Sequence, residues 1–181
     1  SDVCSSDLPA LQSKRVVTGN PVRPSVLAVA GQPYPGFEGG VLRLLVTGGS
    51  QGARVMSDIV PEAVTALPAE LRARLRLVQQ ARAEDIERVQ AMYADAGVEA
   101  EIAPFFADLP ARIAAAHVVI ARAGASTVTE LAVIGRPSLL VPLPQSLDGD
   151  QAANAAMIAE AGAAEMVRQS DFIPAFLAGR L

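Results

Sequence analysis

Residues 42–53 read LRLLVTGGSQGA, a hydrophobic run that passes directly into a glycine-rich turn. The run Leu42–Thr47 is nearly continuously apolar rather than alternating, which is typical of a strand buried on both faces of a parallel sheet. Three glycines allow a sharp turn, and free N–H groups at the start of a following helix favour an anion. The stretch predicts a strand, an anion-binding turn and a helix. A tight turn without a ligand is the alternative.

The strand–helix alternation continues along the chain. Five further strands are expected from short apolar runs, at Leu75–Gln79, Val98–Ala103, His117–Ala121, Ser138–Val141 and Ala164–Val167. Periodicity and end signals predict helices at Glu84–Ala96, Thr127–Ile134 and Asp150–Ala161. This pattern predicts an α/β fold with a doubly wound, mainly parallel, Rossmann-like sheet of six or seven strands. Ligands of such sheets bind outside the carboxyl ends of the strands.

Composition excludes several classes of protein. The 181 residues carry a net charge of −4, and aromatic residues make up 4% with no Trp. Neither a basic stripe nor a set of stacking platforms is therefore expected, which argues against nucleic acid as a partner. No run approaches the ~18 consecutive apolar residues of a membrane span. No spacing of His, Cys and Asp predicts a metal site, and the single Cys4 permits no internal disulfide.

Two familiar nucleotide sites do not fit the glycine turn. A P-loop ends in Gly-Lys-Ser or Gly-Lys-Thr, whereas Gly52 is followed by Ala53 and Arg54. A dinucleotide site needs a carboxylate near the tip of the second strand, but residues 78–82 read VQQAR. An NAD-binding oxidoreductase is therefore the weaker alternative.

A second glycine-containing loop, RAGASTVTE, occupies residues 122–130 after the strand expected at 117–121. Small residues there permit a ligand close to the backbone, and a helix N-terminus favours its negative charge. Thr127 and Glu130 have the spacing of a capping box, in which Glu130 satisfies a backbone N–H. In the other interpretation, Glu130 accepts hydrogen bonds from a ribose diol. Position alone favours the cap.

A third loop, PLPQSLDGDQ, occupies residues 142–151. Its prolines fix the exit from the strand, and polar residues gather at the start of the next helix. Asp148 and Asp150 are candidate caps for that helix. Gln151 offers both a donor and an acceptor, as sugar hydroxyls require.

Five pieces of the chain, in register, resemble the donor-binding C-terminal half of the MurG family in glycosyltransferase family 28. They are GNPVR (19–23), LLVTGGSQGA (44–53), FFADL (105–109), RAGASTVTE (122–130) and DQAANA (150–155). The family comprises the undecaprenyl-diphospho-muramoylpentapeptide β-N-acetylglucosaminyltransferases. The resemblance implies a GT-B enzyme that transfers GlcNAc from UDP-GlcNAc to lipid I, without a cofactor. It also implies a peripheral position at the cytoplasmic face of the bacterial inner membrane, in peptidoglycan synthesis.

The resemblance also assigns donor contacts to individual residues. Nucleotide contacts are expected from Arg23 and Ser50, and the Phe106 backbone is expected to face the uracil. The loop stretch Ala125, Ser126 and Thr127 would lie against the diphosphate and sugar, continuing through Val128 and Thr129. Glu130 would hold the ribose and Gln151 the GlcNAc hydroxyls. With the family in view, ribose binding by Glu130 becomes the favoured interpretation over the cap.

The expected domain organisation combines composition with the same resemblance: residues 1–8 are Ser- and Asp-rich without periodicity, and the stretch up to Gly40 is rich in Pro and Gly. Residues 1–8 are interpreted as a disordered or foreign leader, 9–22 as the last strand of an N-terminal acceptor domain and 23–40 as an interdomain linker. Residues 41–181 are expected to form the UDP-GlcNAc-binding domain, truncated at its C-terminus. Catalytic residues and lipid I contacts are then expected in the missing N-terminal domain. His117 is expected to be a packed residue rather than a catalytic one.

A non-catalytic nucleotide-binding module remains a further alternative. It would share the glycine turn and the binding loops but perform no transfer. Binding titrations with UDP-GlcNAc, UDP, UDP-glucose and NAD separate the three hypotheses.

Overall fold

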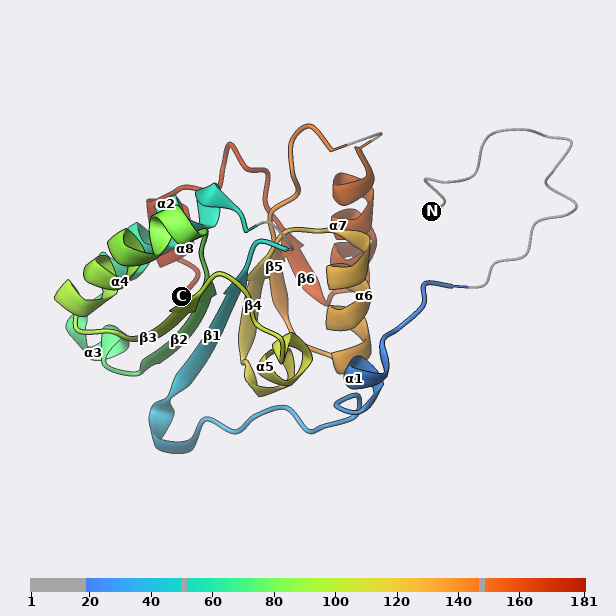
Figure 1. Ribbon diagram of the computed structural model, residues 1–181, viewed down its shortest axis with the longest axis horizontal. Helices are drawn as coiled ribbons and strands as arrows, with labels where there is room; N and C mark the ends of the chain where they lie inside the picture. Colours follow the sequence, from blue (N-terminus) through green and yellow to red (C-terminus); the bar gives the residue numbers. More distant parts are fainter. Residues whose placement is uncertain (1–18, 50–51, 147–148) are drawn as a thin grey trace, which may run out of the picture.

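The computed structural model describes residues 19–49, 52–146 and 149–181 (Figure 1). The expectations for residues 1–18, Ser50 and Asp148 lie outside these ranges. Six strands form one sheet in the order β3-β2-β1-β4-β5-β6, and every pairing is parallel. This confirms the doubly wound sheet. The strands are β1 (Leu42–Thr47), β2 (Leu75–Gln80), β3 (Glu99–Ala103), β4 (Val118–Ala121), β5 (Ser138–Leu140) and β6 (Ala164–Met166).

Helices cover both faces of the sheet, as Figure 1 shows. One layer holds α2 (Arg54–Thr65), α4 (Ile86–Asp95) and α8 (Pro174–Ala178), with the short α3 (Ala69–Arg72) nearby. The other layer holds α1 (Pro24–Leu27), α5 (Leu109–Ala115), α6 (Ala125–Ile134) and α7 (Asp150–Glu160). Two 3-10 turns, η2 (Glu38–Gly40) and η3 (Ala83–Asp85), precede β1 and α4. No helix within the described ranges is long and apolar enough to cross a lipid bilayer.

The central strand β1 supplies both cores because alternate side chains point to opposite faces of a strand. Leu44 and Val46 pack into the cluster under α2 and α4, whereas Leu45 packs into the cluster under α5 and α6. All three are at most 1% exposed. The continuous apolar run therefore reflects burial on both faces, as the sequence predicted.

The start of α6 differs from the prediction. The helix begins at Ala125 with Gly124 as N-cap and no side-chain cap, so Thr127 and Glu130 do not form a capping box. Gly124 has the extended backbone angles that are usual for an N-cap, and the helix starts two residues before the predicted position. Glu130 therefore lies in the second turn, where its carboxylate is free to contact another segment.

The stretch predicted as an interdomain linker contains ordered structure. Helix α1 packs against α5 and α6, and Val26 is fully buried in the second core. Pro24 supplies the first residue of this helix, where its missing N–H costs nothing. The assignment of 23–40 as a linker stays a prediction. Arg23 is held immediately before a packed helix.

His117 ends the loop before β4 and is fully buried. The Arg43 N–H donates to its Nδ1 at 2.9 Å, so the proton lies on Nε2, 3.2 Å from the carbonyl oxygen of Gly36. The ring of Phe37 stacks on it, with centroids 4.4 Å apart. These contacts give His117 a packing role at the amino end of the sheet.

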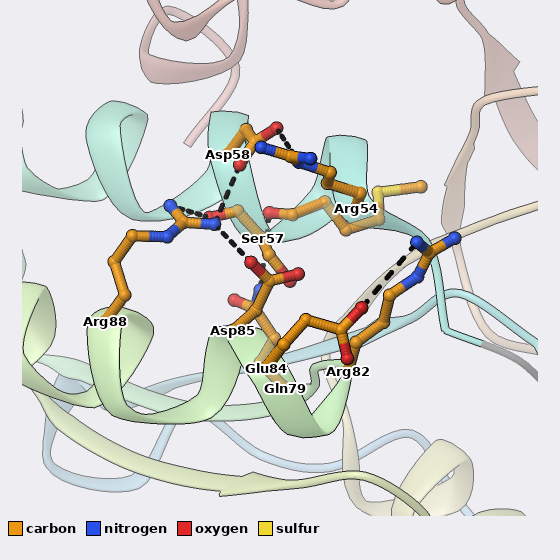
Figure 2. A network of polar contacts seen from close by, with 9 residues as sticks. Arg54, Ser57, Asp58, Gln79, Arg82, Glu84, Asp85 and Arg88 are labelled. Carbon is orange, nitrogen blue, oxygen red and sulfur yellow. Dashed lines mark hydrogen bonds and ion pairs between the residues drawn. The ribbon is translucent and has the colours of Figure 1, made fainter.

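An ion-pair cluster fastens α2 to α4 (Figure 2). The Arg88 guanidinium contacts Asp58 of α2 at 2.8 Å and Asp85 of η3 at 2.7 Å, and it donates to the Ser57 carbonyl at 3.2 Å. The hydrogen bond to Asp85 raises the pKa of Arg88. Helix α4 is also joined to β2, because the Tyr93 hydroxyl donates to Gln79 Oε1 at 2.6 Å.

Candidate functional site

The sheet reverses its winding between β1 and β4. From β1 the chain proceeds outward to β2 and β3, and from β4 it proceeds in the other direction to β5 and β6. The loops after β1 and β4 therefore diverge and leave a crevice at the carboxyl edge. A pocket of about 300 Å³ lies there, lined by Arg23, Thr47, Gly49, Gln80, Phe105, Phe106, Leu109, Ser126, Thr127 and Glu130.

The glycine turn begins at Gly48 and Gly49, and Gly49 lines one side of the pocket. A Cβ on Gly48 would lie 2.2 Å from the Ala53 nitrogen, a distance that no side chain tolerates. Gly49 has a φ of +82°, a left-handed conformation that favours glycine. The following helix α2 has no side-chain cap and no acidic residue in its first turn. Its N-terminal amides therefore present positive partial charge without a neutralising side chain.

Gln80 ends β2 directly behind this turn. Its Oε1 accepts from the Thr47 hydroxyl at 2.9 Å and from the Gly48 N–H at 3.1 Å. Its Nε2 donates to the carbonyls of Gly49 at 2.8 Å and Pro104 at 3.0 Å. This side chain occupies the tip where a dinucleotide site carries a carboxylate.

The opposite side of the pocket is built by α6 and the segment before α1. Arg23 donates to Glu130 Oε1 from both Nε at 3.0 Å and Nη2 at 2.7 Å. Asn20 fastens the same segment through a 2.7 Å hydrogen bond to the Thr129 hydroxyl. Glu130 is buried, whereas Arg23 is exposed. A buried carboxylate thus faces the pocket with one oxygen held by a guanidinium.

Two adjacent aromatic residues, Phe105 and Phe106, form the third side. Phe105 is 68% exposed at the mouth of the pocket, while Phe106 is buried beneath the Arg112 guanidinium, 4.2 Å from the ring centroid. Arg112 is held by Glu101 and Asp108, both at 2.7 Å. The hydrogen bond from Arg112 lowers the pKa of Asp108, and the two carboxylates raise the pKa of Arg112.

The loops after β4 and β5 are fastened to each other outside the pocket. Arg122 donates to the Val141 carbonyl at 3.0 Å and to Gln169 at 2.6 Å, and its burial lowers its pKa. Asn154 of α7 donates to the Ala123 carbonyl at 3.1 Å. Gln151 accepts the Leu143 N–H at 3.0 Å, which stabilises the start of α7.

Of the nine expected donor contacts within the described residues, the structure places five around the pocket. Its lining includes Arg23, Phe106, Ser126, Thr127 and Glu130. Among the others, Val128 is buried in the core, Thr129 hydrogen-bonds within α6, and Ala125 and Gln151 lie outside the lining. Their roles toward a donor stay predictions.

Sequence reasoning missed the contributions of Gln80 and Phe105. The pair Gln79–Gln80 was noted only for lacking a carboxylate, although two polar residues ending an apolar strand are a signal in themselves. Phe105 belongs to the quoted FFADL turn, in which the exposed and the buried ring cannot be distinguished from the sequence. Leu109 and Thr47 complete the lining at the ends of quoted motifs.

The chain is similar in sequence and in structure to known glycosyltransferases. Residues 43–180 match the glycosyltransferase family 28 C-terminal domain. A relative from Methylobacterium sp. (strain 4-46), named UDP-N-acetylglucosamine--N-acetylmuramyl-(pentapeptide) pyrophosphoryl-undecaprenol N-acetylglucosamine transferase, is 66% identical over 171 residues, or 93% of this chain. A relative of the same name from Granulibacter bethesdensis is 55% identical over 179 residues, or 98% of this chain. Each match covers 46% of the relative, so the chain spans about half the length of these curated proteins.

A solved structure gives the same result. The crystal structure of Acinetobacter baumannii MurG superposes with a TM-score of 0.73 at 33% identity, covering 92% of this chain and 46% of that one. The family match spans most of the chain, including both glycine-containing loops and Glu130. The chain belongs to the glycosyltransferase family 28 C-terminal domain family.

Proposed function

We propose that the pocket binds the uridine diphosphate part of UDP-GlcNAc. The observation that carries this proposal is the Glu130 carboxylate, buried at the pocket with one oxygen held by Arg23. A carboxylate in this position accepts hydrogen bonds from a ribose diol, and the charged acceptor makes them strong. The names of the relatives, which act on UDP-N-acetylglucosamine, support the same ligand.

The diphosphate is proposed to lie between two helix N-termini. Helix α6 begins at the pocket, where Ser126 and Thr127 line it, and α2 follows the glycine turn, whose Gly49 lines it. Both helices begin without a side-chain cap and without an acidic residue in the first turn. Each N-terminus carries about half a positive charge, which stabilises a negatively charged group. This arrangement also stabilises a departing diphosphate when the bond to the sugar breaks.

The complete reaction is proposed to be transfer of GlcNAc to lipid I, at the cytoplasmic face of the bacterial inner membrane. Transfer needs a base within reach of the acceptor hydroxyl. Among the described residues that line the pocket, Glu130 is the one carboxylate, and Arg23 engages it. His117 is buried at the opposite end of β4. We therefore assign donor binding to this chain and the base to a part of the enzyme outside the pocket described here.

Titration calorimetry with UDP-GlcNAc, UDP, UDP-glucose and NAD tests the proposal. UDP-GlcNAc and UDP are expected to bind and NAD is not, because Gln80 stands where a dinucleotide enzyme needs an acid. Preference for UDP-GlcNAc over UDP-glucose would show that the chain contacts the N-acetyl group. Saturable binding of NAD without binding of UDP would overturn the assignment in favour of an oxidoreductase.

A transfer assay addresses the catalytic part. The 181-residue chain is expected to bind UDP-GlcNAc and to transfer none of it to a lipid I analogue. Addition of a separately produced N-terminal half from a relative is expected to restore slow turnover. Transfer by the chain alone above a no-enzyme control would place the base in this half, with Asp148 and Asp150 as the first residues to replace.

A further inference from the structure

Gln80 occupies a position that the donor chemistry alone does not explain. It is 4% exposed, and it lies at the carboxyl end of β2, next to the end of β1 on one side and β3 on the other. Although it borders the pocket, its polar atoms already have partners in the protein. It therefore acts on a ligand through other groups rather than by direct contact.

The hydrogen bonds of Gln80 saturate its amide. A primary amide accepts two hydrogen bonds and donates two, and Gln80 makes all four, at 2.8–3.1 Å. The Gly48 N–H can only donate, and the carbonyls of Gly49 and Pro104 can only accept. One orientation of the amide satisfies all of them. A carboxylate of the same size would place negative charge against two carbonyl oxygens.

These four bonds join two separate sides of the pocket. Three of them hold the end of β1 and the start of the glycine turn, at Thr47, Gly48 and Gly49, and Gly49 also accepts the Gly52 N–H at 3.1 Å. The fourth holds Pro104, directly before Phe105 and Phe106. Gln80 thus adds a side-chain link between the glycine turn and the aromatic side, next to the backbone ladders that join β1, β2 and β3.

We propose that Gln80 is a positioning residue that fixes the glycine turn relative to the Phe105–Phe106 side, and thereby fixes the diphosphate relative to the base of the nucleotide. This inference rests on the proposed function. A ligand that spans both sides, such as UDP, depends on their spacing. A ligand that reaches only the aromatic side and Glu130, such as uridine, does not.

The test compares Gln80→Glu with Gln79→Glu in the full chain. Gln79 is the matched control, because it is the adjacent residue of β2, is fully buried, and bonds to Tyr93 and the Met56 carbonyl away from the pocket. Affinities for UDP and uridine are measured by calorimetry or by competition, and folding by urea denaturation. Gln80→Met is a second variant that removes the hydrogen bonds without introducing charge.

Both Gln80 variants are expected to lose at least tenfold in UDP affinity and less than threefold in uridine affinity. Gln79→Glu is expected to lower the denaturation midpoint while leaving the UDP-to-uridine affinity ratio within threefold of wild type. The inference is overturned if folded Gln80→Met keeps the wild-type ratio, or if Gln79→Glu changes the ratio equally. Failure of the wild-type chain to bind UDP would instead refute the proposed function.

Discussion

Two arginine–carboxylate pairs in this molecule resemble each other in geometry, although we propose a ligand-binding role for only one of them. In the pair at the pocket, the side chain of Arg23 is 57% exposed and that of Glu130 is 8% exposed. In the pair between α2 and α4, the corresponding values are 43% for Arg88 and 8% for Asp85. Each pair closes at 2.7 Å. Distance and burial alone do not distinguish a binding residue from a structural one.

The two pairs differ in their surroundings. Arg88 also contacts Asp58 and the Ser57 carbonyl, so protein groups occupy its donors and join two helices (Figure 2). Glu130 lines a pocket together with Ser126 and Thr127 at the uncapped N-terminus of α6, where a ligand can supply further partners. A buried carboxylate that lines a pocket is therefore a candidate for ligand binding. A buried carboxylate that is enclosed by other protein groups is a candidate for stabilising the fold.

The largest expected effect is the loss of nucleotide binding in Glu130→Ala. A charged hydrogen-bond acceptor contributes roughly 1.5–3 kcal/mol, so UDP affinity should fall about 10- to 150-fold. Folding should change little, because an exposed arginine remains solvated and its pair contributes about 0–1 kcal/mol. Calorimetry with UDP and urea denaturation measure the two effects. Lost stability with unchanged UDP affinity would make the Arg23–Glu130 pair structural.

The reverse outcome is expected for Arg88→Met. The substitution leaves the buried Asp85 carboxylate without its cation, and half-exposure of Arg88 reduces the cost to about 1–2 kcal/mol. Urea denaturation should detect that loss, while UDP affinity stays within twofold of wild type. A tenfold fall in UDP affinity in the folded variant would show that the α2–α4 cluster belongs to the site.

Alkaline pH should lower the free energy of unfolding of the wild-type chain through Tyr93 of α4. Burial raises the pKa of Tyr93, so the unfolded chain releases this proton at lower pH than the folded chain does. The associated stability is fully present below about pH 10 and falls by up to about 1.4 kcal/mol per pH unit above it. Denaturation midpoints between pH 8 and 11 measure the slope. Tyr93→Phe should flatten it, and an equal slope in that variant would contradict the assignment.

The smallest effect is expected at acid pH. The Arg112 hydrogen bond lowers the pKa of Asp108, so its contribution is present above the usual pKa of about 3.9 and is lost as pH falls through the lowered value. Because Asp108 is exposed, solvent screens the pair and the loss should be slight. Denaturation of Asp108→Asn between pH 2 and 5 provides the comparison. Identical pH profiles for the variant and wild type would show that the Asp108–Arg112 pair does not contribute to the acid dependence of stability.

The sequence predicted regular elements better than side-chain partners. The range Leu42–Thr47 matches β1 at both ends, because burial on both faces imposes a continuous apolar run. The capping box failed because α6 begins at Ala125, with Gly124 as its N-cap, which the Thr127–Glu130 spacing does not reveal. The Arg23–Glu130 contact joins residues 107 positions apart. Likewise, the bonds of Gln80 depend on how three strands align, so they become visible only in the fold.

Amide chemical shifts during a UDP titration test most directly that the pocket between β1 and β4 holds the nucleotide. Saturable shifts are expected at Gly48, Gly49, Phe106 and Thr127, with little change at Arg88, which does not line the pocket. Shifts gathered instead around Arg88, with those four amides unmoved, would contradict the account.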